Sequence, residues 1–258
     1  MIADFSLRGK VAVVTGAAVG GIGEAYARAL AEAGAAVACT DINEPGARGV
    51  ADAIVGDGGR AIAVGADTTD EGSVQAMVQR AVAELGGIDI LVNNAALMAQ
   101  LAAGGTTLGF PPELWDRAFA VNVKGLWHCA RAVVPEMVKR GGGSIVNQSS
   151  IGAFPAESVY GITKIAVIGL TTALARELGP ANINVNCIAP GLTSSEAGKA
   201  LTPEGSPYFE MMKMRAALRV RGEPSDLCGA LLLLVSPAGS WITGQVIVAD
   251  GGIVLHTT

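Results

Sequence analysis

Apolar residues in this chain fall in short, nearly continuous runs rather than alternating with polar ones. Seven such runs predict strands over 11–14, 36–40, 61–64, 88–92, 144–147, 183–188 and 246–249. Strands without polar alternation are typical of a parallel sheet that is covered on both faces.

Segments with helical periodicity separate the predicted strands. They predict helices over 22–33, 71–85, 113–139, 159–178 and 224–235, a weaker helix that ends near Val55, and a bend near Pro135. Regular alternation of strands and helices predicts an α/β fold, a doubly wound seven-stranded parallel sheet with helices on both faces. No linker or internal repeat interrupts the pattern, so we expect a single domain over 1–258.

Composition narrows the classes of function. Half of the 258 residues are hydrophobic, 16% are charged and the net charge is −5, which gives no basic surface for nucleic acid. The longest uninterrupted apolar run, 229–235, is too short to span a membrane, and the first ten residues have no apolar signal core. The spacing of Cys39, Cys129, Cys187 and Cys228 suits no metal site, so we expect reduced thiols in a cytoplasmic protein and no bound metal.

A glycine-rich loop, TGAAVGGIG, joins the first predicted strand to the first helix at Thr15–Gly23. Glycines there let a pyrophosphate approach the backbone, and the helix N-terminus supplies free N–H groups, although a tight turn without a ligand has the same composition. Asp41 ends the second predicted strand, eighteen residues after Gly23. A carboxylate at that place accepts hydrogen bonds from a ribose diol and repels a 2′-phosphate, which favours NAD over NADP, unless Asp41 is only a solvated turn residue.

Polar residues that could act in catalysis stand near the ends of later elements. Tyr160 and Lys164 are four residues apart on a predicted helix and so share one face. An ammonium beside a phenol favours the phenolate, which could take the proton of an alcohol, although a surface pair would have the same spacing. Ser149 and Ser150 end a strand, where doubly wound folds bind ligands. Asn122 interrupts an apolar helical run and could equally be a buried, hydrogen-bonded amide.

Together these motifs resemble the short-chain dehydrogenase/reductase family, in its single-domain branch of about 250 residues, over essentially the whole chain. Asn93–Ala96 (NNAA), Pro190–Gly191 and Asp250–Gly252 (DGG) add to the resemblance. It implies a Rossmann-type fold with NAD as cofactor. The cofactor contacts that it implies are Gly16, Gly21, Ile22, Gly23, Asp41, Asp67, Thr68, Asn94, Ala95, Tyr160, Lys164, Pro190, Gly191, Thr193 and Ser195.

The resemblance also implies a catalytic tetrad of Asn122, Ser150, Tyr160 and Lys164. In it, Tyr160 is the general acid/base and Ser150 positions the reacting oxygen. Lys164 lowers the pKa of Tyr160 and binds the nicotinamide ribose, and Asn122 holds a water that relays protons from Lys164.

Two spacings depart from the family pattern. The glycine loop holds one extra residue, which we expect to form a bulge at Val19–Gly20. The interval from serine to tyrosine is also short, which leaves Ser149 as a rival to Ser150. We choose Ser150, because strand register is more constrained than loop length.

The family resemblance assigns the segment 192–222 to a loop that covers the substrate, and here that loop is rich in methionine and aromatic residues. They could form an apolar lid or ordinary core, and we expect Arg215, Arg219 and Arg221 to face solvent. The substrate expected is therefore a moderately hydrophobic secondary alcohol or ketone. We also expect a homo-oligomer, a tetramer or a dimer, because the helix over 159–178 is apolar around much of its circumference. The rival functions are an NADPH-dependent carbonyl or 3-oxoacyl-carrier-protein reductase, a sugar-nucleotide epimerase or dehydratase, and a non-catalytic dinucleotide sensor.

Overall fold

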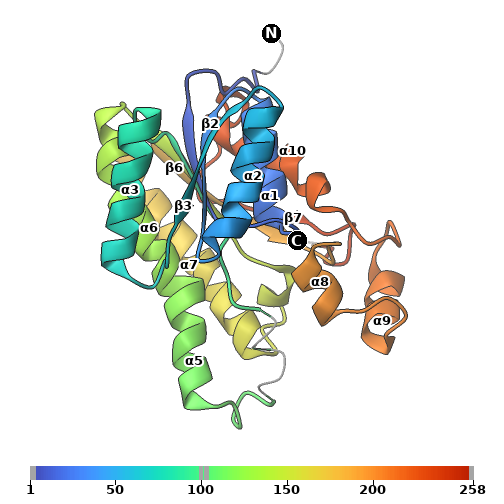
Figure 1. The fold of residues 1–258 in the computed structure, drawn as a ribbon. Helices are drawn as coiled ribbons and strands as arrows, with labels where there is room; N and C mark the ends of the chain where they lie inside the picture. The colour runs from blue at the N-terminus through green and yellow to red at the C-terminus, as the bar shows by residue number, and fades with distance from the viewer. Residues whose placement is uncertain (1–3, 99–100, 102–104, 256–258) are drawn as a thin grey trace.

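The seven predicted strands form one parallel sheet in the computed structural model, which describes residues 4–98, 101 and 105–255 (Figure 1). Within these residues the strand order is β3-β2-β1-β4-β5-β6-β7, so the order reverses between β1 and β4. The strands are β1 (Val11–Thr15), β2 (Ala36–Asp41), β3 (Arg60–Gly65), β4 (Ile90–Asn93), β5 (Gly143–Gln148), β6 (Ile183–Pro190) and β7 (Val246–Ala249).

Helices cover both faces of this sheet (Figure 1). One face carries α1 (Ile22–Glu32), α2 (Glu44–Gly56) and α10 (Cys228–Val235), and the other carries α3 (Glu71–Leu85), α6 (Gly125–Lys139) and α7 (Val159–Leu178). Alternate residues of a strand enter opposite layers: Val13 packs with the α3, α6 and α7 layer, and Val14 packs with the α1, α2 and α10 layer. The apolar runs are continuous because both layers are dry.

Two segments differ from the helices that periodicity predicts. The long helical region is not interrupted at Pro135, which lies inside α6. The irregularity is instead a π-helical turn, η1 (Ala120–Lys124), between α5 (Pro112–Phe119) and α6. The segment 192–222 is not wholly irregular either, since it contains α8 (Glu196–Leu201) and α9 (Pro207–Arg215), which stand away from the sheet in Figure 1. Short helical turns complete the chain at η2 (Ile151–Ala153), η3 (Gly179–Ala181), η4 (Pro224–Leu227) and η5 (Pro237–Gly239).

Helix α7 is long and apolar enough, by length and composition alone, to cross a membrane. The sequence analysis considered only the shorter apolar run at 229–235 and did not identify this candidate. In the fold, however, it lies against β6 and buries residues of both polar and apolar type, including Thr163, Lys164 and Thr171. A helix with this environment is a core helix, because its buried polar groups are matched by partners in the protein.

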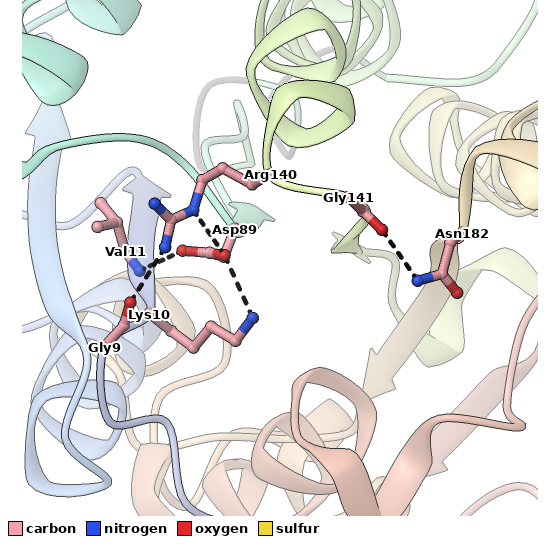
Figure 2. A network of polar contacts seen from close by, with 7 residues as sticks. All are labelled: Gly9, Lys10, Val11, Asp89, Arg140, Gly141 and Asn182. Atoms are coloured by element: carbon pink, nitrogen blue, oxygen red, sulfur yellow. Dashed lines mark hydrogen bonds and ion pairs between the residues drawn. The ribbon is translucent and has the colours of Figure 1, made fainter.

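A buried carboxylate fastens the amino-terminal edge of the sheet (Figure 2). Asp89 precedes β4 and accepts hydrogen bonds from Val11 N at 2.9 Å, Lys10 Nζ at 3.3 Å and Arg140 Nε at 2.8 Å. Arg140 also donates to Gly9 O at 3.1 Å, so the end of α6 is joined to the start of β1. A carboxylate that leaves water must be matched in this way, and the network therefore fixes where three segments meet.

Replacing Asp89 by alanine is expected to lower the free energy of unfolding by about 2–3 kcal/mol, because hydrogen bonds to a buried charged group are lost. The exposed pair Arg80–Glu84 offers a matched control, and Glu84→Ala should change stability by about 0.5 kcal/mol or less. Urea unfolding of both variants measures the difference. Equal losses in the two variants would show that the Asp89 network does not stabilise the fold.

Candidate active site

A cavity of about 700 Å³ opens at the carboxyl ends of the strands, beside the point where the strand order reverses. The glycine loop, the end of β2 and the residues after β4, β5 and β6 form its walls, and α8 and α9 cover it. Doubly wound folds bind ligands at this place. Most of the predicted site residues line the cavity, namely Gly16, Gly21, Ile22, Asp41, Asn94, Ala95, Ser150, Tyr160, Lys164, Pro190, Gly191, Thr193 and Ser195.

Some glycines of the loop are required by close packing within the protein, and others leave the backbone open toward the cavity. A Cβ on Gly16 would lie 2.8 Å from Ala95 Cα, and one on Gly23 would lie 2.1 Å from Gly16 O, so both glycines are needed for close packing of the loop. Gly21 is different, because a Cβ there would meet no atom closer than 3.4 Å and the residue lines the cavity. Gly21 also leaves the N-terminus of α1 without a side-chain cap. Free N–H groups and an open backbone fit a dinucleotide pyrophosphate.

The segment Val19–Gly20, where the extra residue is expected, borders the cavity. Val19 is 55% exposed, and Gly20 adopts a φ of 84°, which is accessible to glycine at little cost. Gly20 N donates to Glu24 Oε2 at 2.7 Å, and Gly20 O accepts from Glu196 N at 3.0 Å. Hydrogen bonds to α1 and to the first residue of α8 therefore hold this segment in place.

Asp41 reaches the glycine loop from the end of β2. Its Oδ2 accepts from Ala18 N at 3.1 Å and its Oδ1 accepts from Asn43 N at 2.8 Å. The carboxylate is half-buried and borders the cavity, so it is more than a solvated turn residue. Its negative charge is fixed at the part of the cavity next to the loop.

Tyr160 and Lys164 lie on the first turns of α7 and both border the cavity. Lys164 is fully buried, and its Nζ lies 5.5 Å from the centre of the Tyr160 ring. The same Nζ donates to Gln148 O at 2.9 Å, so the main chain at the end of β5 holds the ammonium in place. The helical spacing thus brings a phenol and an amine into one site.

Burial governs the protonation of this pair. It raises the pKa of Tyr160 to about 12, against a side-chain hydrogen bond with Ser150 that lowers it. Burial also lowers the pKa of Lys164 from its ordinary 10.5 to about 8. The protein alone therefore does not produce the depressed tyrosine pKa that the sequence predicts, because a dry site disfavours both charged forms. A positively charged ligand beside the phenol would be needed to favour the phenolate.

The two candidate serines have different environments. Ser149 is buried, and its Oγ donates to Lys164 O at 2.8 Å, which joins β5 to α7. Ser150 is the N-cap of η2, where its Oγ accepts from Gly152 N at 3.1 Å, and it also forms the hydrogen bond with Tyr160. Geometry thus favours Ser150 as the serine beside the reacting groups and gives Ser149 a structural contact.

Asn122 is fully buried in the π-helical turn η1, and its side chain does not line the cavity. Its Oδ1 accepts from Leu97 N at 2.7 Å, and its Nδ2 donates to Leu97 O at 3.0 Å and to Thr163 Oγ1 at 3.1 Å. The amide is used to hold the segment after β4 against α7, which matches the reading of Asn122 as a hydrogen-bonded buried amide.

Three other predicted contacts also lie outside the cavity wall: Gly23, Asp67 and Thr68. Asp67 Oδ1 accepts from Thr69 N at 2.8 Å and from Thr69 Oγ1 at 2.7 Å, so this carboxylate shapes the turn after β3. Thr68 O contacts His128 Nδ1 at 3.1 Å on α6.

The outer wall of the cavity is mostly apolar. Met98, Leu101, Phe110, Leu201 and Met212 line it, so the lid residues contribute to the cavity as well as to packing. Gln148 also borders the cavity. The sequence analysis did not single it out, although a glutamine at the end of an apolar strand was a visible signal.

The expectation that Arg221 faces solvent is wrong. Its guanidinium lies 4.7 Å from the centre of the Phe209 ring, and its Nη2 donates to Thr202 O at 2.5 Å. Its Nε and Nη1 are buried with no hydrogen-bond partner among the described residues. Arg221 therefore links Thr202, at the end of α8, to Phe209, near the start of α9. Of these three residues only Thr202 lines the cavity.

This fold is a Rossmann-type doubly wound sheet, with a cavity at the point where its strand order reverses. A family model described as enoyl-(acyl carrier protein) reductase matches residues 16–254. An uncharacterized oxidoreductase of Mycobacterium tuberculosis is 48% identical over 248 residues, which cover 96% of this chain and 98% of the relative. The chain belongs to the short-chain dehydrogenase/reductase family.

Two solved structures are similar to this one over nearly their full length. A 7α-hydroxysteroid dehydrogenase complexed with NADH and 7-oxo glycochenodeoxycholic acid has a TM-score of 0.89 at 38% identity, and the match covers 99% of this chain and 98% of that one. A gluconate 5-dehydrogenase from Burkholderia cenocepacia in complex with NADP and tartrate has a TM-score of 0.89 at 33% identity, with 97% of both chains covered. Structures of this fold are thus known in complex with either dinucleotide.

Replacing Lys164 by methionine is expected to stabilise the cofactor-free protein at pH 7, by about 1–3 kcal/mol. At that pH the lysine is charged in both states, and burial penalises the charge only in the folded protein. Between pH 8 and 10.5 the folded protein releases this proton before the unfolded chain does, so wild-type stability rises with pH and the advantage of the variant shrinks. Urea unfolding at pH 7 and pH 10 measures this change.

Lys124→Met is the matched control for this experiment, because Lys124 is exposed. It should show neither the gain nor the pH dependence. A Lys164→Met protein that is no more stable than wild type at pH 7 would contradict the assigned burial penalty.

Proposed function

We propose that this protein transfers a hydride between NAD(H) and a secondary alcohol or ketone, with Tyr160 as the general acid/base. The main support for the proposal is that Ser150, Tyr160 and Lys164 line the same cavity as the glycine loop. An acid/base group is what separates a dehydrogenase from a protein that only senses a dinucleotide.

The contacts of these residues support the roles that the family resemblance implies. The bound oxidised cofactor supplies a hydride acceptor and a positive charge. Ser150 positions the hydroxyl of the substrate, and Tyr160 takes its proton as the C–H bond yields its hydride; in the reverse direction Tyr160 returns the proton to the carbonyl oxygen. Lys164 provides the second positive charge beside the phenol. Asn122 acts as a positioning residue, since its amide holds Leu97 and Thr163.

The choice of NAD(H) rests on Asp41. Its carboxylate is fixed at the cavity next to the glycine loop, where a 2′-phosphate would meet a negative charge. The relative complexed with NADH supports this cofactor, and the relative complexed with NADP keeps NADP(H) as the alternative that an assay must separate.

The substrate that fits best is a bulky, moderately hydrophobic alcohol. The apolar wall offers contact area rather than specific polar partners, which suits an extended ring system better than a small polyol. The similar 7α-hydroxysteroid dehydrogenase, whose complex contains a 7-oxo bile acid, supports this class.

The test is a panel of secondary alcohols, including hydroxysteroids, assayed with NAD⁺ and NADP⁺ by the absorbance of the reduced cofactor. Tyr160→Phe should lower kcat at least about 1000-fold with NADH binding kept, because only the acid/base is lost. Ser150→Ala should lower kcat about 100-fold, whereas its neighbour Ser149→Ala should mainly lower stability. Full turnover by Tyr160→Phe would refute the proposed chemistry, and a preference for NADP⁺ would refute the role of Asp41.

We further propose that the protein is a cytoplasmic homo-oligomer, a tetramer or a dimer. Apolar side chains remain exposed on the outer sides of α6 and α7, where Trp127 is 39% and Ile165 is 44% exposed. A second copy would cover them. Light scattering at micromolar concentration should give a multiple of the 26.0 kDa chain mass, and a monomer would contradict the proposal.

A further inference from the structure

Gln148 is a polar residue where the strand pattern calls for an apolar one. It is the last residue of β5, it is only 6% exposed, and it borders the cavity next to Ser149. Its main-chain oxygen holds Lys164 Nζ, but that contact is independent of the side chain. A buried primary amide costs free energy unless its groups are matched, so its presence calls for a partner.

Tyr26 supplies one half of that match. Its hydroxyl donates to Gln148 Oε1 at 3.0 Å, from a fully buried ring that packs in the apolar layer of α1, α2 and α10. Burial also raises the pKa of Tyr26, so the phenol keeps its proton. If the amide were turned over, the phenol hydrogen would have no acceptor, which is the more costly arrangement. The tyrosine therefore fixes the carboxamide with its nitrogen away from α1.

The amide nitrogen is left without a partner among the residues that the structure describes. It is not among the buried atoms that lack both a partner and solvent contact, so it keeps access to the cavity that Gln148 lines. An oriented donor of this kind, more than nine-tenths buried, is suited to an acceptor oxygen on a ligand.

We propose that Gln148, oriented by Tyr26, donates a hydrogen bond to an oxygen of the nicotinamide half of the bound dinucleotide. Tyr26 is one helical turn beyond Ile22 at the glycine loop, and the main-chain oxygen of Gln148 holds Lys164 on the side of the reacting groups. The amide thus lies between the predicted pyrophosphate and reaction regions. Ribose, phosphate and carboxamide oxygens of that half are all suitable acceptors. The inference rests on the proposed function in that it needs a nicotinamide dinucleotide as the cofactor.

The experiment compares two ligands of the intact protein: NADH, and ADP, which lacks the nicotinamide half. Gln148→Leu should raise the Kd for NADH about tenfold, equivalent to about 1.4 kcal/mol, and leave the Kd for ADP within about twofold. Tyr26→Phe keeps the amide but frees its orientation, and it should raise the Kd for NADH by a smaller factor, about threefold, again without affecting ADP. Gln75→Leu, at an exposed position of α3, is the matched control and should change neither constant.

The outcomes separate the inference from its alternatives. Equal weakening of NADH and ADP, accompanied by a lower unfolding temperature, would mean that Gln148 only supports the fold, and the inference would fail. Unchanged NADH binding in Gln148→Leu would overturn it while leaving the proposed function intact. A wild-type protein that binds neither ligand would overturn both.

Discussion

Buried polar groups are costly unless they find partners inside the protein, and the side-chain amides at the carboxyl edge of this sheet meet most of that demand. Among the described residues, Asn93 Oδ1 is an exception, because it is buried without a partner. Asn93 Nδ2 donates to Asn147 Oδ1 on the next strand at 2.9 Å and to Leu126 O on α6 at 3.2 Å, and Asn147 Nδ2 donates to Thr171 Oγ1 on α7 at 3.0 Å. These bonds run across β4, β5 and two covering helices. They tie the carboxyl ends of β4 and β5 to α6 and α7, the elements next to Ser150 and Lys164 at the cavity.

The cost of burying polar groups also explains the shifted pKa values of Tyr160 and Lys164 in the candidate site. Lys164 is held by a carbonyl oxygen, and burial penalises its charge; burial likewise favours the neutral form of Tyr160. Greater exposure to water would weaken both effects. The protein gives up some stability for a site whose protonation depends on what is bound.

The sequence predicted most elements well, because buried strands form continuous apolar runs and helices repeat their apolar residues every three to four positions. The bounds of α3, α7 and β7 are those predicted. It also located Tyr160 and Lys164, since a helix fixes neighbours four residues apart. It missed the pairing of Tyr26 with Gln148, because 122 residues separate them and no local pattern records the contact. The partners of Asn122 and the enclosure of Arg221 were hidden for the same reason: they depend on tertiary packing.

The charged network around Asp89 and the cavity lie at opposite ends of the same strands. The residues that tie β1 to α6 do not line the cavity. Changes in the loops after β4 and β6 therefore leave this anchorage untouched. A protein engineer could therefore exchange the covering segment of α8 and α9 while keeping every residue of the Asp89 network.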